Sequence, residues 1–181
     1  PGAFRMALSG EMEAVLDSVK RTGELRLEAE SDSLNFLLTM LPAEERLFYN
    51  LPKGMRLQGE AFVANQAYQA ELHFREDKGK MDLTAHYDPT REAYQAALRV
   101  DSLEPVHFMP LDSLYSLTAS LQVEGKGTDP FAAQTWAKIE GAVNDIRYGL
   151  TSVSDVRLKG ALEQHALQME LVSGYPLAKF D

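Results

Sequence analysis

Apolar and polar residues alternate along most of this chain, and a period of two is typical of half-buried β-strands. Within residues 25–29, for example, Arg26 and Glu28 separate three apolar side chains. The same alternation runs through residues 55–59, 119–123 and 156–162. The pattern therefore predicts a mainly β protein.

Residues 68–100 contain three successive alternating runs, which form an antiparallel meander when their apolar faces are matched. A tight loop at 77–79, with Gly79 supplying a positive φ angle, places Tyr68 beside Tyr87. A second turn at 88–92 places Tyr87 beside Tyr94. In this register alanine also lies beside alanine and leucine beside leucine on one face, while the other face is polar.

A second hairpin is predicted near the end of the chain, where Leu158 faces Leu171 and Leu162 faces Leu167. Each strand then contributes three or four apolar side chains to the same side of the sheet. A soluble monomer tolerates only a few hundred Å² of contiguous apolar surface. The apolar face must therefore be covered, curved onto itself or filled.

Helical signals are brief. In "SDSLNFLLTMLP", residues 31–42, leucines recur at helical spacing before Pro42, which predicts a short helix. A further turn is expected in 43–48, a single turn in 105–110, and another short helix in 129–136. These segments are expected to be insertions between strands.

The triplet Asp-Ser-Leu occurs at 32–34 and again at 101–103. An alternating strand precedes each copy, and a strand containing Leu-Gln follows each copy. The repeated unit is predicted to be a strand, a short helical crossover, a strand and then hairpins. Residues 1–181 are therefore interpreted as a single fragment of a repetitive β-sheet array, with approximate internal units 23–91 and 92–181.

Composition narrows the possible partners. The net charge is −9 at pH 7 and the basic residues form no stripe, which argues against nucleic acid as a partner. There is no cysteine, so disulfides and thiolate metal sites are excluded. No apolar run is long enough to span a membrane. Because the sequence begins at Pro1, we expect an excised part of a longer protein, with any membrane anchor outside it.

Motifs for catalysis are lacking in the sequence. The histidines have no metal-ligand spacing, and no nucleophile elbow or phosphate-binding loop is present. In the predicted register His73 lies beside Asp82 and Arg99, on a solvated face that offers no pocket. We therefore expect no enzymatic activity, no catalytic residues, no metal site and no cofactor.

The apolar rows are the remaining functional candidates. They suit a conventional core between two sheets, and they equally suit a hydrophobic groove that holds an acyl chain. The pattern alone leaves both interpretations open. The candidate groove-lining residues are Leu25, Leu27, Leu57, Tyr68, Ala70, Leu72, Phe74, Met81, Leu83, Ala85, Tyr87, Tyr94, Ala96, Leu98, Val100, Leu121, Val123, Val156, Leu158, Leu162, Leu167, Met169 and Leu171.

Three stretches carry a family resemblance. They are the "DSL…MP" segments, "GKGTDPF", and "IRYG" followed by "VRLKGAL", in this order and spacing. Together they make the chain resemble the TamB/AsmA-like proteins of Gram-negative bacteria, particularly those of the Bacteroidota.

This resemblance implies an elongated antiparallel sheet curved into a U-shaped groove, a β-taco, lined by apolar side chains. It also implies a periplasmic location in a protein anchored in the inner membrane. Such proteins are expected to move phospholipids or other acyl chains between the membranes, or to assist outer-membrane protein assembly with a β-barrel partner. The alternative is a non-catalytic closed β-sandwich, a scaffold or adhesion module that binds a protein partner through its loops.

Overall fold

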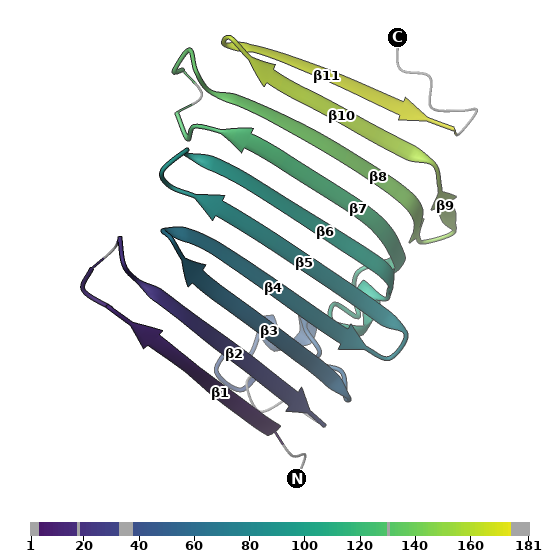
Figure 1. The fold of residues 1–181 in the computed structure, drawn as a ribbon. Helices are drawn as coiled ribbons and strands as arrows, with labels where there is room; N and C mark the ends of the chain where they lie inside the picture. Colours follow the sequence, from purple (N-terminus) through teal and green to yellow (C-terminus); the bar gives the residue numbers. More distant parts are fainter. Residues whose placement is uncertain (1–3, 18, 33–37, 130, 175–181) are drawn as a thin grey trace.

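The computed structural model describes residues 4–17, 19–32, 38–129 and 131–174. All described strands belong to one antiparallel sheet, in the spatial order β1-β2-β3-β4-β5-β6-β7-β8-β10-β11, with β9 paired to β8 beside this path (Figure 1). The mainly β, antiparallel prediction is confirmed. The elements are β1 (Phe4–Glu13), β2 (Thr22–Ser31), η1 (Glu45–Phe48), β3 (Met55–Ala64), β4 (Ala67–Glu76), β5 (Gly79–Asp88), β6 (Ala93–Leu103), η2 (Pro105–His107), β7 (Leu114–Lys126), β8 (Trp136–Tyr148), β9 (Thr151–Val153), β10 (Val156–Glu163) and β11 (Ala166–Ser173), where η1 and η2 are 3-10 helices.

The predicted strand register is confirmed for the central meander and for the last hairpin. Tyr68 pairs with Tyr87 and Tyr87 with Tyr94 across β4, β5 and β6. Leu158 pairs with Leu171 across β10 and β11. Shifting any of these strands by one residue would turn its apolar side chains to the opposite face, which explains why the pattern fixes the register.

The β4–β5 loop differs from the prediction in one respect. Asp77, with φ of 48°, is the residue with positive φ, and Gly79 is not. Gly79 is required for another reason, because a Cβ there would lie 3.0 Å from Leu103 Cδ1 and 3.1 Å from the Glu76 carbonyl oxygen. Its missing side chain lets the end of β6 approach the loop closely.

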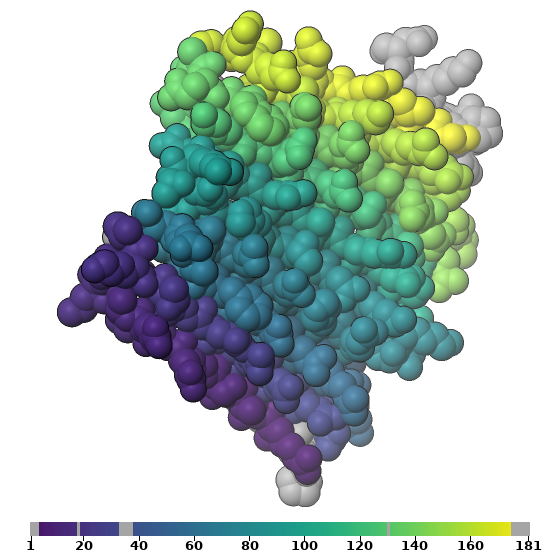
Figure 2. Space-filling model, in the orientation of Figure 1, coloured from purple at the N-terminus to yellow at the C-terminus, as the bar shows by residue number. Residues whose placement is uncertain are grey.

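The described strands form a single layer. Figure 2 shows this layer as a broad slab, in which the colours pass in order from the N-terminal to the C-terminal strands. β1 and β11 lie at opposite edges of the slab, and the described residues of these two strands do not pair with each other (Figure 1). The described strands therefore do not form the two packed sheets of the sandwich alternative.

The two longest connections lie behind the sheet in Figure 1, and both leave it at the same end. The connection between β2 and β3 contains η1 and is called here the first insertion. The connection between β6 and β7 contains η2 and is called the second insertion. Each joins neighbouring antiparallel strands, so the strands on either side of a predicted crossover pair directly. The division into units 23–91 and 92–181 stays a prediction.

The helix predictions have mixed outcomes. The turns expected in 43–48 and 105–110 are present as η1 and η2. Residues 33–37, the middle of the helix predicted for 31–42, lie outside the described residues. The helix predicted for 129–136 is wrong for its described residues, which form hydrogen-bonded turns instead. The cause is local, because Asp129 Oδ1 accepts a hydrogen bond from the Phe131 N–H at 2.9 Å and competes with a helix.

Candidate functional site

One face of the sheet, called here the apolar face, carries rows of side chains that run across the strands from β1 to β11. The tyrosine row consists of Met12, Gly23, Val63, Tyr68, Tyr87, Tyr94, Gly125, Ala137, Leu162 and Leu167. The alanine row consists of Gly10, Leu25, Ala61, Ala70, Ala85, Ala96, Val123, Ile139, Gly160 and Met169. The leucine row consists of Leu8, Leu27, Gly59, Leu72, Leu83, Leu98, Leu121, Gly141, Leu158 and Leu171.

A fourth row lies nearer the insertions and consists of Met6, Ala29, Leu57, Phe74, Met81, Val100, Ala119, Val143, Val156 and Ser173. Directly paired residues share a face of a sheet, so all four rows point to the same side. Every candidate lining residue named from the sequence belongs to one of these rows. Their role in holding a lipid stays a prediction.

The alanine row forms the floor of a hollow. On β4 to β6 its short side chains lie between the tyrosines of one row and the leucines of the other. The hollow has a volume of about 540 Å³ and is lined from β1 to β6, by Met12, Arg21, Leu25, Ala61, Val63, Tyr68, Ala70, Ala85, Tyr87, Tyr94 and Ala96 among others. It opens to solvent, since Tyr68 and Tyr87 remain 40% and 37% exposed.

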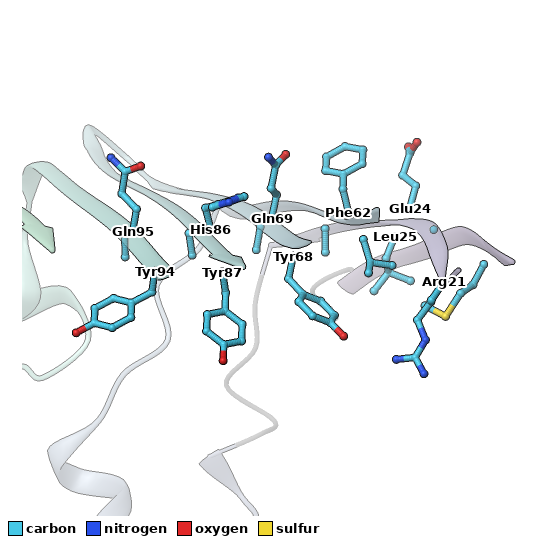
Figure 3. A pocket seen from close by; sticks show the side chains of 17 residues that line it. Arg21, Glu24, Leu25, Phe62, Tyr68, Gln69, His86, Tyr87, Tyr94 and Gln95 are labelled. Carbon is cyan, nitrogen blue, oxygen red and sulfur yellow. The ribbon is translucent and has the colours of Figure 1, made fainter. Parts of the chain in front are cut away.

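Figure 3 shows the two sides of the sheet at this hollow. Tyr68, Tyr87 and Tyr94 project together to the side of the hollow, and Arg21 projects to the same side. Phe62 and four polar or charged side chains project to the opposite side, namely Glu24, Gln69, His86 and Gln95. The side chains of these last five residues therefore point away from the hollow, and only their backbone lines it. The hollow is thus apolar except at its rim.

The opposite face of the sheet is polar. Arg56 and Glu30 form an ion pair there at 2.8 Å, with both side chains largely exposed. The predicted pair of His73 and Asp82 is present, with 2.6 Å between His73 Nδ1 and Asp82 Oδ1. Both side chains are about 40% exposed, at 41% and 39%. Exposed pairs of this kind contribute roughly 0–1 kcal/mol, as expected for a solvated face.

The insertions cover one end of the apolar face. The Phe108 ring lies 6.0 Å from the ring of Phe74, a member of the fourth row. The two insertions also contact each other, because the Asn50 N–H donates to the Phe108 carbonyl at 2.7 Å and Asn50 Nδ2 donates to the His107 carbonyl at 2.8 Å. Beneath them lie the most buried apolar side chains of this end, Met55 and Val100.

A charged cluster fastens the second insertion to the sheet. Glu76 ends β4 on the apolar face and its side chain is only 4% exposed. His107 Nδ1 lies 2.9 Å from Glu76 Oε1, and His107 Nε2 lies 2.9 Å from Glu104 Oε2. Each ring nitrogen of His107 therefore has a carboxylate oxygen within hydrogen-bond distance. Glu76 Oε2 is buried without a hydrogen-bond partner among the described residues.

The carboxyl group of Asp88, in the turn between β5 and β6, has a shifted pKa. The pKa of Asp88 is lowered, chiefly because the Thr90 hydroxyl donates a hydrogen bond to the carboxylate at 2.5 Å. Backbone N–H groups of Thr90 and Arg91 donate to the same oxygen. Asp88 thus stabilises the β5–β6 turn.

Two further properties concern only the described part of the chain. No group of three His, Asp or Glu side chains is arranged there to hold a metal ion. None of its helices has the length and apolar character needed to cross a membrane.

Sequence reasoning missed two strands of the apolar face. β1 contributes Met6 and Leu8, and β8 contributes Ile139 and Val143. The signal was present, because apolar residues or glycine occupy every second position throughout β1 and over residues 137–143 of β8. Glycines at 10 and 141 interrupt the apolar alternation and weaken it. The short alanines and glycines become informative only when the strands are aligned beside one another.

Comparison with known proteins gives no relative. No family model, no curated protein and no solved structure matches the chain. The resemblance to the TamB/AsmA-like proteins therefore stays a prediction.

Proposed function

We propose that this chain is a segment of a cell-envelope protein that carries phospholipids, with their acyl chains held against the apolar face of the sheet. One observation carries the proposal: the apolar rows continue across all ten strands of the main path, from β1 through β8 to β10 and β11. A site for a single small molecule combines an apolar pocket with a few fixed polar groups. A surface along which acyl chains pass needs the same apolar character at every strand.

The size of the apolar face supports this proposal. Ten strands about 4.8 Å apart, each about ten residues long, outline on the order of 1,400 Å². The largest apolar patch on a typical soluble monomer is roughly 300–600 Å². The insertions cover one end only, and Leu8 and Met169 are still 61% and 66% exposed. An acyl chain would remove such side chains from water, which is favourable by roughly 25 cal/mol per Å².

The direction of the hollow supports passage along the sheet. The alanine row crosses the strands, so the hollow follows the long axis of the strand array and not the strands themselves. An extended acyl chain lying in it would contact the same row at each successive strand. Adjacent strands repeat this environment about every 4.8 Å.

The wider setting is part of the same proposal and rests on the resemblance to TamB/AsmA-like proteins. The sheet is proposed to bend into a U-shaped groove around its ligand, in the periplasm, within a protein whose inner-membrane anchor lies outside this chain. Phospholipid movement between the two membranes is the primary role. Assistance to outer-membrane protein assembly with a β-barrel partner is the secondary one.

Two neighbouring alanines provide the experiment. Ala96 lies on the floor of the hollow, and Ala97 lies on the polar face of the same strand. Ala96→Trp fills the hollow, whereas Ala97→Trp adds the same bulk to the other side. The wild-type chain and both variants are purified, extracted with organic solvent and analysed by mass spectrometry.

The wild-type chain and Ala97→Trp are expected to yield phospholipid, and Ala96→Trp much less. Circular dichroism and urea titration of both variants separate a blocked hollow from loss of the fold. Absence of lipid from the wild-type chain, or equal lipid in the two folded variants, refutes the proposal.

A further inference from the structure

Arg21 stands at the rim of the hollow, next to the turn between β1 and β2. In Figure 3 it is the charged side chain that points to the same side as the tyrosines, whereas Glu24 points away. Glu11 and Glu13 also lie on the polar face, because side chains alternate between the two faces along β1. Arg21 is therefore the charged side chain that faces the hollow among those labelled in Figure 3, although the net charge of the chain is −9.

The guanidinium of Arg21 uses only some of its N–H groups in hydrogen bonds to the described residues. Its Nε and Nη2 donate to the Val15 carbonyl oxygen at 3.1 and 2.7 Å. A guanidinium has five N–H groups, and the other three have no hydrogen-bond partner among the described residues. Arg21 forms no ion pair with the described carboxylates. The nearby Asp17 carboxylate instead accepts hydrogen bonds from the backbone N–H groups of Val19 and Lys20.

The tyrosine hydroxyls extend this polar rim. Tyr68, Tyr87 and Tyr94 form none of the side-chain hydrogen bonds found among the described residues. They lie on β4, β5 and β6, and Arg21 lies at the start of β2. Four strand spacings of about 4.8 Å separate β2 from β6, so the polar groups extend over roughly 19 Å. The alanine row runs beside them as an apolar floor.

We propose that the hollow binds an anionic phospholipid, with its phosphate at Arg21, a glycerol ester group beside the hydroxyl of Tyr68, the nearest of the three tyrosines in strand order, and an acyl chain along the alanine row toward β6. The inference rests on the proposed function and adds the head-group selectivity of the same site. A guanidinium binds phosphate through parallel charge-assisted hydrogen bonds. A fatty acid, whose head group is one carboxylate, could reach Arg21 but has no glycerol ester oxygen to accept a hydrogen bond from Tyr68.

The charge of the lipid head group determines which phospholipid binds more tightly beside Arg21. A glycerol head group leaves the phosphate with its full negative charge, whereas a choline head group places a cation beside it. The positive rim at Arg21 therefore favours phosphatidylglycerol over phosphatidylcholine. The phosphate is the same in both lipids, so the preference comes from repulsion between Arg21 and the choline cation, and we expect it to be about a tenfold difference in affinity.

The test uses lysophosphatidylglycerol, lysophosphatidylcholine and a fatty acid of the same chain length, each as a monomer in equilibrium dialysis. The wild-type chain is expected to bind lysophosphatidylglycerol about tenfold more tightly than lysophosphatidylcholine. Arg21→Gln is expected to abolish that difference, and Arg21→Lys to retain part of it, because lysine keeps the charge without the planar fork. Lys20→Gln, which removes a neighbouring cation, is the matched control and should keep the preference.

Several results would overturn the inference. These are equal binding of the two lysolipids to the wild-type chain, an equal loss of both in Arg21→Gln, or an Arg21-dependent preference for the fatty acid over lysophosphatidylglycerol. An equal loss of both lysolipids would mean that Arg21 only stabilises its turn. If Arg21→Gln fails to fold, Arg21→Lys provides the second variant. Ala96→Trp tests the hollow itself: if it leaves binding of all three probes unchanged, the proposed function fails, and not only the head-group assignment.

Discussion

Replacing His107 with alanine is expected to release the second insertion from the sheet. The substitution removes the partner of Glu76 Oε1, and Glu76 Oε2 already has no hydrogen-bond partner among the described residues. A carboxyl group that is 4% exposed would then lose its only side-chain hydrogen-bond partner among the described residues. His107→Ala should therefore destabilise the fold far more than removal of an exposed histidine pair.

The magnitude follows from burial. Leaving a buried polar group without its hydrogen-bond partner costs roughly 1–3 kcal/mol, and more when the group is charged. The His107 side chain is 35% exposed, so water can reach part of the vacated space and reduce this cost. We expect His107→Ala to lower the free energy of unfolding by about 2–3 kcal/mol. His73→Ala removes a similar pair with Asp82 on the polar face, and should cost less than about 1 kcal/mol.

Urea unfolding followed by circular dichroism measures both variants. A double-mutant cycle with Glu76→Gln isolates the pair and should give a coupling energy of about 1–3 kcal/mol. Limited proteolysis between 104 and 113 reports release of the insertion directly, because that segment would leave Phe74. Equal destabilisation by His107→Ala and His73→Ala, or no coupling with Glu76, refutes the reasoning.

Three further predictions concern the rows and one turn. Leu83→Glu should leave the chain folded but abolish lipid binding, whereas the same change in a dry core would cost several kcal/mol; urea titration with lipid extraction distinguishes the two. Gly125→Ala should destabilise the sheet by about 1–3 kcal/mol in urea titration and shift the NMR signals of the Tyr94 ring, because the new Cβ would lie 2.5 Å from that ring; unchanged signals contradict this. Thr90→Val should raise the lowered pKa of Asp88 toward its ordinary value in an NMR titration. The stabilisation from ionised Asp88 is present above that ordinary value and is lost as the pH falls through the lowered pKa, so Thr90→Val should reduce it; an unchanged titration midpoint contradicts the prediction.

The sequence by itself determined the strands and the register of the central sheet. Period-two alternation decides which side chains share a face, and short turns leave only one pairing in which like rows meet. The positions of Tyr68, Ala70, Leu72 and Phe74 relative to β5 and β6 follow from this local information. The polar character of the opposite face follows from the same alternation.

The tertiary structure alone decided how the apolar face is covered and where it is hollow. Asn50 contacts His107 and Phe108 across 57 residues of sequence, and no local pattern encodes such a contact. Glu76 appears in the sequence as an ordinary strand-end carboxylate, and it is buried only because an insertion folds over it. The hollow exists because alanines from separate strands align between longer side chains, which is a property of the assembled sheet and not of any single strand.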